Sequence, residues 1–171
     1  MHIFLSGAKQ VGKSTLIRKI LENAPFSYEG ILSFSCFENG DRKVFLKPVC
    51  QKLEPVLAGI CSHQHVVQRH PEVFDSYGVS VLEKASETAD VVVIDEIGNM
   101  EKQADAYSDC IKALVSSDRP VVLGVLQDMA SSELAQFLRS SDNITWYRVD
   151  ESNREDLATE IVRRIEDELH G

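Results

Sequence analysis

The eight residues from Gly7 to Ser14 constrain this chain more than any other segment. They read Gly-Ala-Lys-Gln-Val-Gly-Lys-Ser, which is the G-x-x-x-x-G-K-S pattern of a phosphate-binding loop. Glycine permits backbone conformations that larger residues resist, and successive amide groups form a cradle for an anion. A short apolar run precedes the loop and a helical pattern follows it, so an accidental glycine-rich turn is disfavoured. We therefore expect the chain to bind the phosphates of a nucleoside triphosphate.

Individual roles follow from the position of each residue in this loop. The Lys13 ammonium should reach the β- and γ-phosphates, which makes Lys13 a catalytic as well as a binding residue. The Ser14 hydroxyl should bind Mg²⁺, and the helix that begins near Lys13 should direct its positive end at the same anion. The predicted nucleotide-binding residues are Gly7, Ala8, Lys9, Gln10, Val11, Gly12, Lys13, Ser14 and Thr15.

Two acidic residues end an apolar run in the middle of the chain. The run Val91 to Ile94 suits a strand that is covered on both faces, and Asp95 and Glu96 follow it directly. Asp95 is the candidate acid that supports Mg²⁺, and Glu96 is the candidate base that takes a proton from water. Two solvated acids at a strand end are the alternative, which the phosphate loop makes less attractive. Together the two motifs predict Mg²⁺-dependent hydrolysis.

Strands are predicted to alternate with helices along the chain, which indicates an α/β fold with a mainly parallel sheet between helices. Asn39 and Gly40 supply the two residues of positive φ that a type I′ turn needs. Residues 30–49 should therefore add an antiparallel hairpin to the sheet. No repeat or linker interrupts the pattern, and we expect residues 1–171 to form one domain.

The boundaries of the elements come from apolar periodicity and from residues that stop or start helices. The predicted strands are residues 2–6, 30–37, 43–49, 91–94, 121–126 and 144–149. The predicted helices are residues 13–23, 75–89, 100–115, 132–138 and a last one opened by a capping box of Ser152 and Glu155. Residues 55–62 are either a strand or irregular, and residues 63–72 have no assignment.

Charge and cysteine content narrow the class of partner. The net charge of −9 repels a polyanion, so nucleic acid is not expected as a main partner. No apolar run approaches the ~20 residues that cross a bilayer, and no basic leader precedes the first strand. These features predict a cytoplasmic protein without a membrane partner. The cysteines form no CxxC pair and are expected to be reduced and mostly buried; they are Cys36, Cys50, Cys61 and Cys110.

The segment Asp95-Glu96-Ile97-Gly98-Asn99-Met100-Glu101 resembles the Asp-Glu-Ile-Gly-Lys-Met-Glu signature of the cancer-related nucleoside-triphosphatase family. The resemblance extends over nearly the whole chain. It includes the N-terminal phosphate loop, the Glu-Asn-Gly turn at 38–40 and a Glu-Ser-Asn-Arg segment at 151–154, near a similar Glu-Asn-Arg of the family.

The resemblance implies the fold, the reaction and the cofactor. It implies a three-layer, RecA-like sheet in which another strand separates the phosphate-loop strand from the Asp-Glu strand. It also implies Mg²⁺-dependent hydrolysis of ATP, GTP and other triphosphates to diphosphate and phosphate, with low base selectivity. By motif, Lys13 and Ser14 would bind phosphate and metal, Asp95 would support the metal, and Glu96 would be the base.

Two positions depart from the family pattern. Asn99 stands where the family usually has lysine, and Ser35-Cys36-Phe37 stands where Glu-Val-Arg is common. Cationic groups stabilise the charge that develops in phosphoryl transfer, so the losses could lower turnover. Arg42 is the nearby residue that could compensate.

Three weaker candidates have competing explanations. Gln127 follows the strand 121–126 and would either sense the γ-phosphate and orient water or be a plain loop residue. A local group of potential zinc ligands comprises Cys61, His63, His65 and His70. Exposed polar residues are the favoured explanation for that group. A group of aromatic residues comprises Phe34, Phe37 and Phe45. These could stack on a base, although packing in the core of the hairpin is favoured.

Hydrolysis of nucleoside triphosphates is the first functional hypothesis, because Glu96 stands beside Asp95. A P-loop kinase for a nucleoside or another small acceptor is the second. Such kinases usually carry an arginine-rich lid, whereas residues 130–145 contain only Arg139. A nucleotide-dependent interaction module with little catalysis is the third, because Asn99 and the missing hairpin arginine keep it open.

Overall fold

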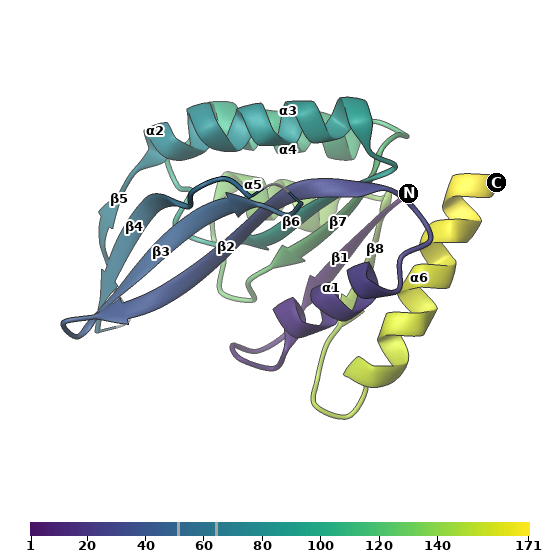
Figure 1. Cartoon of the computed structure of the whole chain (residues 1–171), viewed down its shortest axis with the longest axis horizontal. Helices are drawn as coiled ribbons and strands as arrows, with labels where there is room; N and C mark the ends of the chain where they lie inside the picture. The colour runs from purple at the N-terminus through teal and green to yellow at the C-terminus, as the bar shows by residue number, and fades with distance from the viewer. Residues whose placement is uncertain (51, 64) are drawn as a thin grey trace.

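A computed structural model describes residues 1–50, 52–63 and 65–171 (Figure 1). In these residues the strands form one sheet with the order β5-β4-β3-β2-β6-β7-β1-β8. The strands are β1 (His2–Ser6), β2 (Tyr28–Glu38), β3 (Asp41–Pro48), β4 (Val56–Ser62), β5 (His65–Arg69), β6 (Val91–Ile97), β7 (Val121–Leu126) and β8 (Ile144–Arg148). The helices are α1 (Lys13–Glu22), α2 (Pro71–Val73), the π-helical turn η1 (Phe74–Gly78), α3 (Val79–Thr88), α4 (Asp105–Ser116), α5 (Glu133–Ser140) and α6 (Arg154–His170).

Five strands form a parallel part of the sheet: β2, β6, β7, β1 and β8. Strand β7 lies between β1, which precedes the phosphate loop, and β6, which carries the Asp-Glu pair. The intervening strand of a RecA-like sheet is thereby confirmed. Because all five strands run the same way, the loops that follow them meet at one edge, the carboxyl edge of the sheet.

Strands β3, β4 and β5 form an antiparallel part that continues the sheet from β2. The predicted turn is present, since Asn39 and Gly40 have φ values of 53° and 86°. The antiparallel part is larger than the predicted hairpin, because residues 56–62 and 65–69 are strands as well. In Figure 1 the hairpin of β2 and β3 extends well beyond the helices.

Two hydrophobic cores place helices on both faces of the sheet, so the predicted α/β architecture in three layers is confirmed (Figure 1). Ile3 and Leu5 pack in the core that α1 and α6 cover. Phe4 lies between them in the sequence and packs in the opposite core, with residues of α3, α4 and α5. Side chains alternate between the faces of a strand, so an apolar run such as β1 supplies both cores.

Two predicted helix starts are wrong. Helix α4 begins at Asp105 rather than at residue 100, because the buried Glu101 carboxylate accepts a hydrogen bond from the Gly98 amide (2.6 Å) and closes a turn there. The capping box of Ser152 and Glu155 does not form. The Ser152 hydroxyl donates instead to Asp150 Oδ1 (2.6 Å).

The cysteines differ from the expectation that most are buried. All four are free thiols, but Cys36 and Cys50 are exposed and Cys110 is half-buried, which leaves only Cys61 buried. Cys36 lies on β2, and Cys50 lies just beyond the end of β3. None of the described helices combines the length and the apolar character needed to cross a membrane.

Candidate active site

The phosphate loop connects β1 to α1 at the carboxyl edge of the sheet. Gly7 and Gly12 have φ values of 143° and 100°, which a residue with a side chain rarely adopts. Lys13 is buried, and its ammonium donates hydrogen bonds to the Gly7 and Ala8 carbonyls, both at 2.7 Å. The lysine is therefore held inside the loop that the sequence assigns to phosphate.

The remaining predicted residues of the loop surround this lysine. Three of them are exposed at the tip of the loop: Ala8, Lys9 and Gln10. Val11 is half-buried and packs with the core under α1 and α6. Ser14 and Thr15 are exposed in the first turn of α1, where amide groups lack helical partners and are available to an anion.

Asp95, the acid predicted to support the metal ion, lies next to the phosphate loop. The Ser14 hydroxyl is 3.2 Å from Asp95 Oδ1, although the two residues are 81 positions apart. Burial raises the pKa of Asp95 to about 6, and the hydrogen bond from Ser14 acts in the opposite direction. A hydroxyl and an ionised carboxylate are hard oxygen donors, the kind that Mg²⁺ takes together with phosphate oxygens. The residues present thus fit a magnesium ion.

Glu96 and Gln127 form a pair beside Asp95. The pairing of β6 with β7 shifts between Ile94 and Ile97, so the two acids lie in an irregular part of the strand. The side-chain amide of Gln127 donates through Nε2 to Glu96 Oε1. The backbone amide of Glu96 donates to Ser33 Oγ (3.1 Å). The sequence leaves two interpretations of Gln127, a functional residue or a plain loop residue. Its side chain is directed at the carboxylate that the sequence assigns as the base.

Gly98 makes room for this pair. A Cβ at Gly98 would lie 2.4 Å from Gln127 Oε1, so any larger residue would displace the glutamine. The glycine of the Asp-Glu-Ile-Gly motif therefore has a packing reason. Burial raises the pKa of the nearby Glu101 to about 7, while its hydrogen bond from Gly98 acts against that rise.

Asn99, which replaces the lysine common in the family, binds neighbouring backbone. Its Nδ2 donates to the Met129 carbonyl (3.2 Å), and its Oδ1 accepts from the Ser131 amide (3.3 Å). Arg42, the candidate to compensate for the missing arginine, contacts Ser35 Oγ and Cys61 Sγ, each at 3.3 Å. Both terminal nitrogens of Arg42 are thus engaged within the hairpin region.

Asp128 is a residue of the site that sequence reasoning missed. Its carboxylate accepts a hydrogen bond from the Gly7 amide (2.9 Å) and pairs with Arg148 (3.3 Å). It therefore holds the first residue of the phosphate loop. The sequence signal that could have identified Asp128 is its position just after the strand 121–126. That strand pairs with β1, so the residues that follow it lie near the phosphate loop.

The zinc and aromatic candidates do not form the sites that were considered. Across residues 1–50, 52–63 and 65–171, no three His, Cys, Asp or Glu side chains gather to hold a metal ion. Phe34 stacks on Phe45 with ring centroids 5.5 Å apart, and Lys47 Nζ lies 5.3 Å from the Phe34 centroid. Phe37 is 78% exposed, so the expectation that it packs in the core of the hairpin is wrong.

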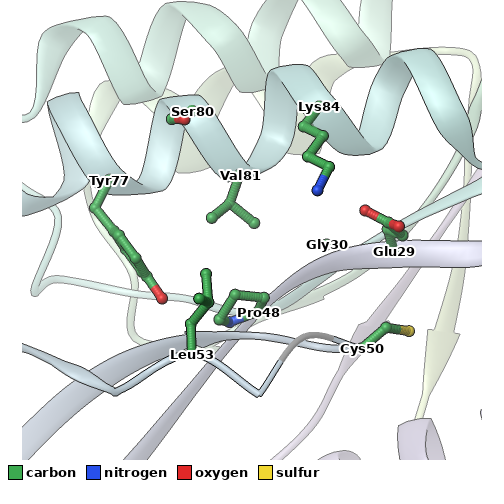
Figure 2. Close-up of a pocket in the computed structure, with 9 residues that line it drawn as sticks. All are labelled: Glu29, Gly30, Pro48, Cys50, Leu53, Tyr77, Ser80, Val81 and Lys84. Atoms are coloured by element: carbon green, nitrogen blue, oxygen red, sulfur yellow. The ribbon is translucent and has the colours of Figure 1, made fainter.

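Two cavities differ in their relation to this site. One, of about 440 Å³, opens beside the phosphate loop and is bounded by Ser6, Gln127, Asp128, Trp146 and Arg148 among others. The other, of about 180 Å³, lies between α3 and the amino end of β2, away from the carboxyl edge. Figure 2 shows Tyr77, Val81 and Lys84 above it and Glu29 and Cys50 below. Only the first lies where phosphate chemistry is expected.

Comparison with known proteins agrees with the motifs and the topology. The sequence model of the NTPase family matches residues 2–162. The chain belongs to the NTPase family. The nucleoside-triphosphatase THEP1 of Methanosarcina barkeri is 30% identical over 173 residues, which cover 96% of this chain and 97% of that protein. The THEP1 protein of Methanocaldococcus jannaschii is 27% identical over 172 residues, with the same shares covered.

Two solved structures are similar in fold to this member of the NTPase family. THEP1 from the hyperthermophile Aquifex aeolicus has a TM-score of 0.80 at 20% identity and covers 97% of this chain and 99% of its own. The solution structure of a human cancer-related nucleoside triphosphatase has a TM-score of 0.69 at 23% identity, with 97% of each chain covered. The predicted family is confirmed, and the chain is a P-loop nucleoside-triphosphatase.

Proposed function

We propose that this enzyme hydrolyses nucleoside triphosphates to diphosphate and phosphate with Mg²⁺ and with low base selectivity. The observation that carries the proposal is the contact between Ser14 Oγ and Asp95 Oδ1 beside Lys13, with Glu96 next in the chain. The relatives named above are nucleoside-triphosphatases, and their names specify no base. Residues 1–171 are taken as one domain of this kind, since both cores pack on one sheet.

Each residue has one task in the proposed reaction. Lys13 leaves the Gly7 and Ala8 carbonyls and binds the β- and γ-phosphate oxygens. Ser14 and Asp95 would hold Mg²⁺, which would supply positive charge to stabilise the transferring phosphate. Glu96, positioned by Gln127, takes a proton from a water molecule. The water oxygen bonds to the γ-phosphorus, the bond from that phosphorus to the β–γ bridging oxygen breaks, and the bridging oxygen leaves on the diphosphate.

The kinase alternative gains no support from Arg139, the only arginine in residues 130–145. Its guanidinium donates to the Ala130 carbonyl (2.8 Å) and the Asp128 carbonyl (3.1 Å), so it serves the local backbone. The alternative of an interaction module predicts the same nucleotide binding as the proposal but little turnover of the nucleotide. A cytoplasmic location remains a prediction, which four free thiols support.

Phosphate release from ATP, GTP, CTP and UTP, with and without Mg²⁺, tests the proposal. Wild type should release phosphate from all four only with Mg²⁺. Lys13→Ala and Glu96→Gln should each lower the rate by on the order of a hundredfold. Glu87→Gln removes an exposed acid of α3 and should stay within about twofold of wild type.

Other results would sink particular parts of the proposal. Full activity of Glu96→Gln would remove Glu96 as the base. Binding of nucleotide without any phosphate release by wild type would favour the interaction module. Transfer of the γ-phosphate to an added nucleoside would favour the kinase.

A further inference from the structure

The segment from Val149 to Arg154, which joins β8 to α6, lies against both glycines of the phosphate loop. A Cβ at Gly7 would lie 2.5 Å from the Val149 carbonyl oxygen. A Cβ at Gly12 would lie 2.9 Å from Arg154 Nη1 and 3.4 Å from Arg154 Cδ. The side chain of Arg154 therefore crosses the loop at the residue before the first turn of α1. Figure 1 shows the two loops at the same edge of the sheet.

Hydrogen bonds within the segment hold Arg154 in this place. Asp150 Oδ1 accepts from the Ser152 amide (2.8 Å) and the Asn153 amide (3.0 Å). Asn153 Nδ2 in turn donates to the Arg148 carbonyl (2.9 Å). Hydrogen bonds from Ser152 lower the pKa of the Asp150 carboxyl, so the acid that orders the segment is ionised at neutral pH. Arg154 begins α6 and is half-buried.

The charge of Arg154 has no partner in the part of the chain that the structure describes. The next residue, Glu155, pairs with Lys19, and Asp128 pairs with Arg148. A guanidinium carries five donors in a planar fork, so that of Arg154 is available to an anionic ligand. In a chain with a net charge of −9, acids are plentiful, yet this arginine lies beside a loop that binds anions.

The order of the strands indicates which phosphate Arg154 meets. Glu96 and Gln127 follow β6 and β7, on one side of β1, whereas Arg154 follows β8, on the other side. The γ-phosphate has to lie on the side of Glu96 if that residue activates the attacking water. The α-phosphate then leaves the loop on the side of β8.

We propose that Arg154 binds the α-phosphate of the nucleotide through its guanidinium fork and holds the nucleotide independently of its base. The proposal rests on the proposed function, because it needs a nucleotide in the phosphate loop. A charge-assisted contact of this kind acts on diphosphates and triphosphates alike. It belongs to binding rather than to the bond-breaking step.

Affinities for ADP and GDP, measured by calorimetric titration with Mg²⁺, test the proposal. Arg154→Met keeps the length of the side chain and removes its charge, so both affinities should fall about tenfold to a hundredfold. Arg154→Lys should recover part of the loss, since it restores the charge without the fork. Arg163→Met removes an exposed arginine of the same helix and should stay within about twofold of wild type.

Each other outcome contradicts the proposal in a different way. Affinities of Arg154→Met within about twofold of wild type would show that the arginine does not touch the nucleotide. A loss for ADP but not for GDP would assign the arginine to recognition of the base rather than of the α-phosphate. Equal losses of affinity in Arg154→Met and Arg154→Lys, together with a lowered Tm, would show that Arg154 has only a packing role. If wild type binds neither ADP nor GDP, the assignment of the phosphate loop is wrong, and the proposed function fails together with the proposal for Arg154.

Discussion

The parallel part of the sheet is buried on both faces, whereas the antiparallel part is largely open on one face. All residues of β7 are buried, and the core side chains of β1 and β6 are fully enclosed. In β5, by contrast, no residue with a described side chain is buried, and beyond Ile31 the side chains of β2 become progressively more exposed. The residues assigned to chemistry follow the buried strands. A rigid, enclosed frame can hold catalytic groups to fractions of an ångström, and an open sheet extension cannot.

Loss of the Asp95 charge should have the largest effect on activity. Asp95→Asn keeps the shape of the residue that meets Ser14 but weakens the proposed metal site, so Mg²⁺-dependent phosphate release should fall by on the order of a hundredfold or more. Asp41→Asn, at the start of β3 in the antiparallel part, is the matched control and should change the rate by less than about twofold. Similar losses in both variants would erase the functional difference between the two parts.

Two phenylalanines sharpen the comparison in terms of stability. Phe4 is fully buried and packs on Trp146 with ring centroids 5.5 Å apart, so Phe4→Ala should cost about 3–5 kcal/mol of unfolding free energy. Phe37, near the tip of the hairpin, is 78% exposed, and Phe37→Ala should cost less than about 0.5 kcal/mol. Urea unfolding of both variants measures the difference. A large loss for Phe37→Ala would mean that something covers the hairpin in solution.

The buried Glu101 should make stability depend on pH. Burial raises its pKa from 4.5 to about 7, so its folded-state pKa lies above the unfolded value. The contribution of Glu101 to stability is then fully present below pH 4.5, and up to about 3 kcal/mol of it is lost as pH rises through 7. Glu101→Gln can still accept from Gly98 but cannot ionise. Its stability relative to wild type should therefore rise between pH 5 and pH 8 in urea unfolding.

Glu87→Gln, on the exposed face of α3, is the control for this measurement and should follow wild type at both values of pH. The raised pKa of Asp95 acts in the same direction, but it is common to all three proteins and cancels in the difference. Parallel stability curves for wild type and Glu101→Gln would contradict the assigned cause.

Removal of the glutamine that contacts Glu96 should have the smallest effect. Gln127→Ala leaves Glu96, the proposed base, in place but no longer orients it, so kcat should fall about tenfold with KM nearly unchanged. Gln68→Ala, on an exposed position of β5, is the corresponding change in the antiparallel part. It should leave both constants as in wild type, and an equal effect of the two changes would remove Gln127 from the site.

The same contrast explains what the sequence could predict. Strands β1 and β7 were predicted residue by residue, because an apolar run buried on both faces has sharp ends. Ser14 and Asp95 were each predicted from a separate motif to serve the same metal ion, and their side chains lie 3.2 Å apart in the structure. Residues 63–72 had no assignment, since β5 is short, polar and at an edge.

Other features of the site could not be read from the sequence because they depend on distant packing. No pattern in the neighbouring sequence predicts that Arg154 lies against Gly12 or that Asp128 accepts a hydrogen bond from the Gly7 amide. The capping box failed for the opposite reason: Asp150 competed for the Ser152 hydroxyl over a shorter range. Local sequence patterns therefore predicted the buried strands, whereas contacts between residues far apart in the sequence complete the site.

The fate of the oxygen atoms tests the central claim, which is that water is the acceptor of the γ-phosphate. ATP should be turned over with Mg²⁺ in water enriched in heavy oxygen, and the released phosphate analysed by mass. The account predicts that each phosphate carries one solvent oxygen and that the diphosphate carries none, because the water attacks the γ-phosphorus. Phosphate without solvent oxygen, or label in the diphosphate, would contradict it.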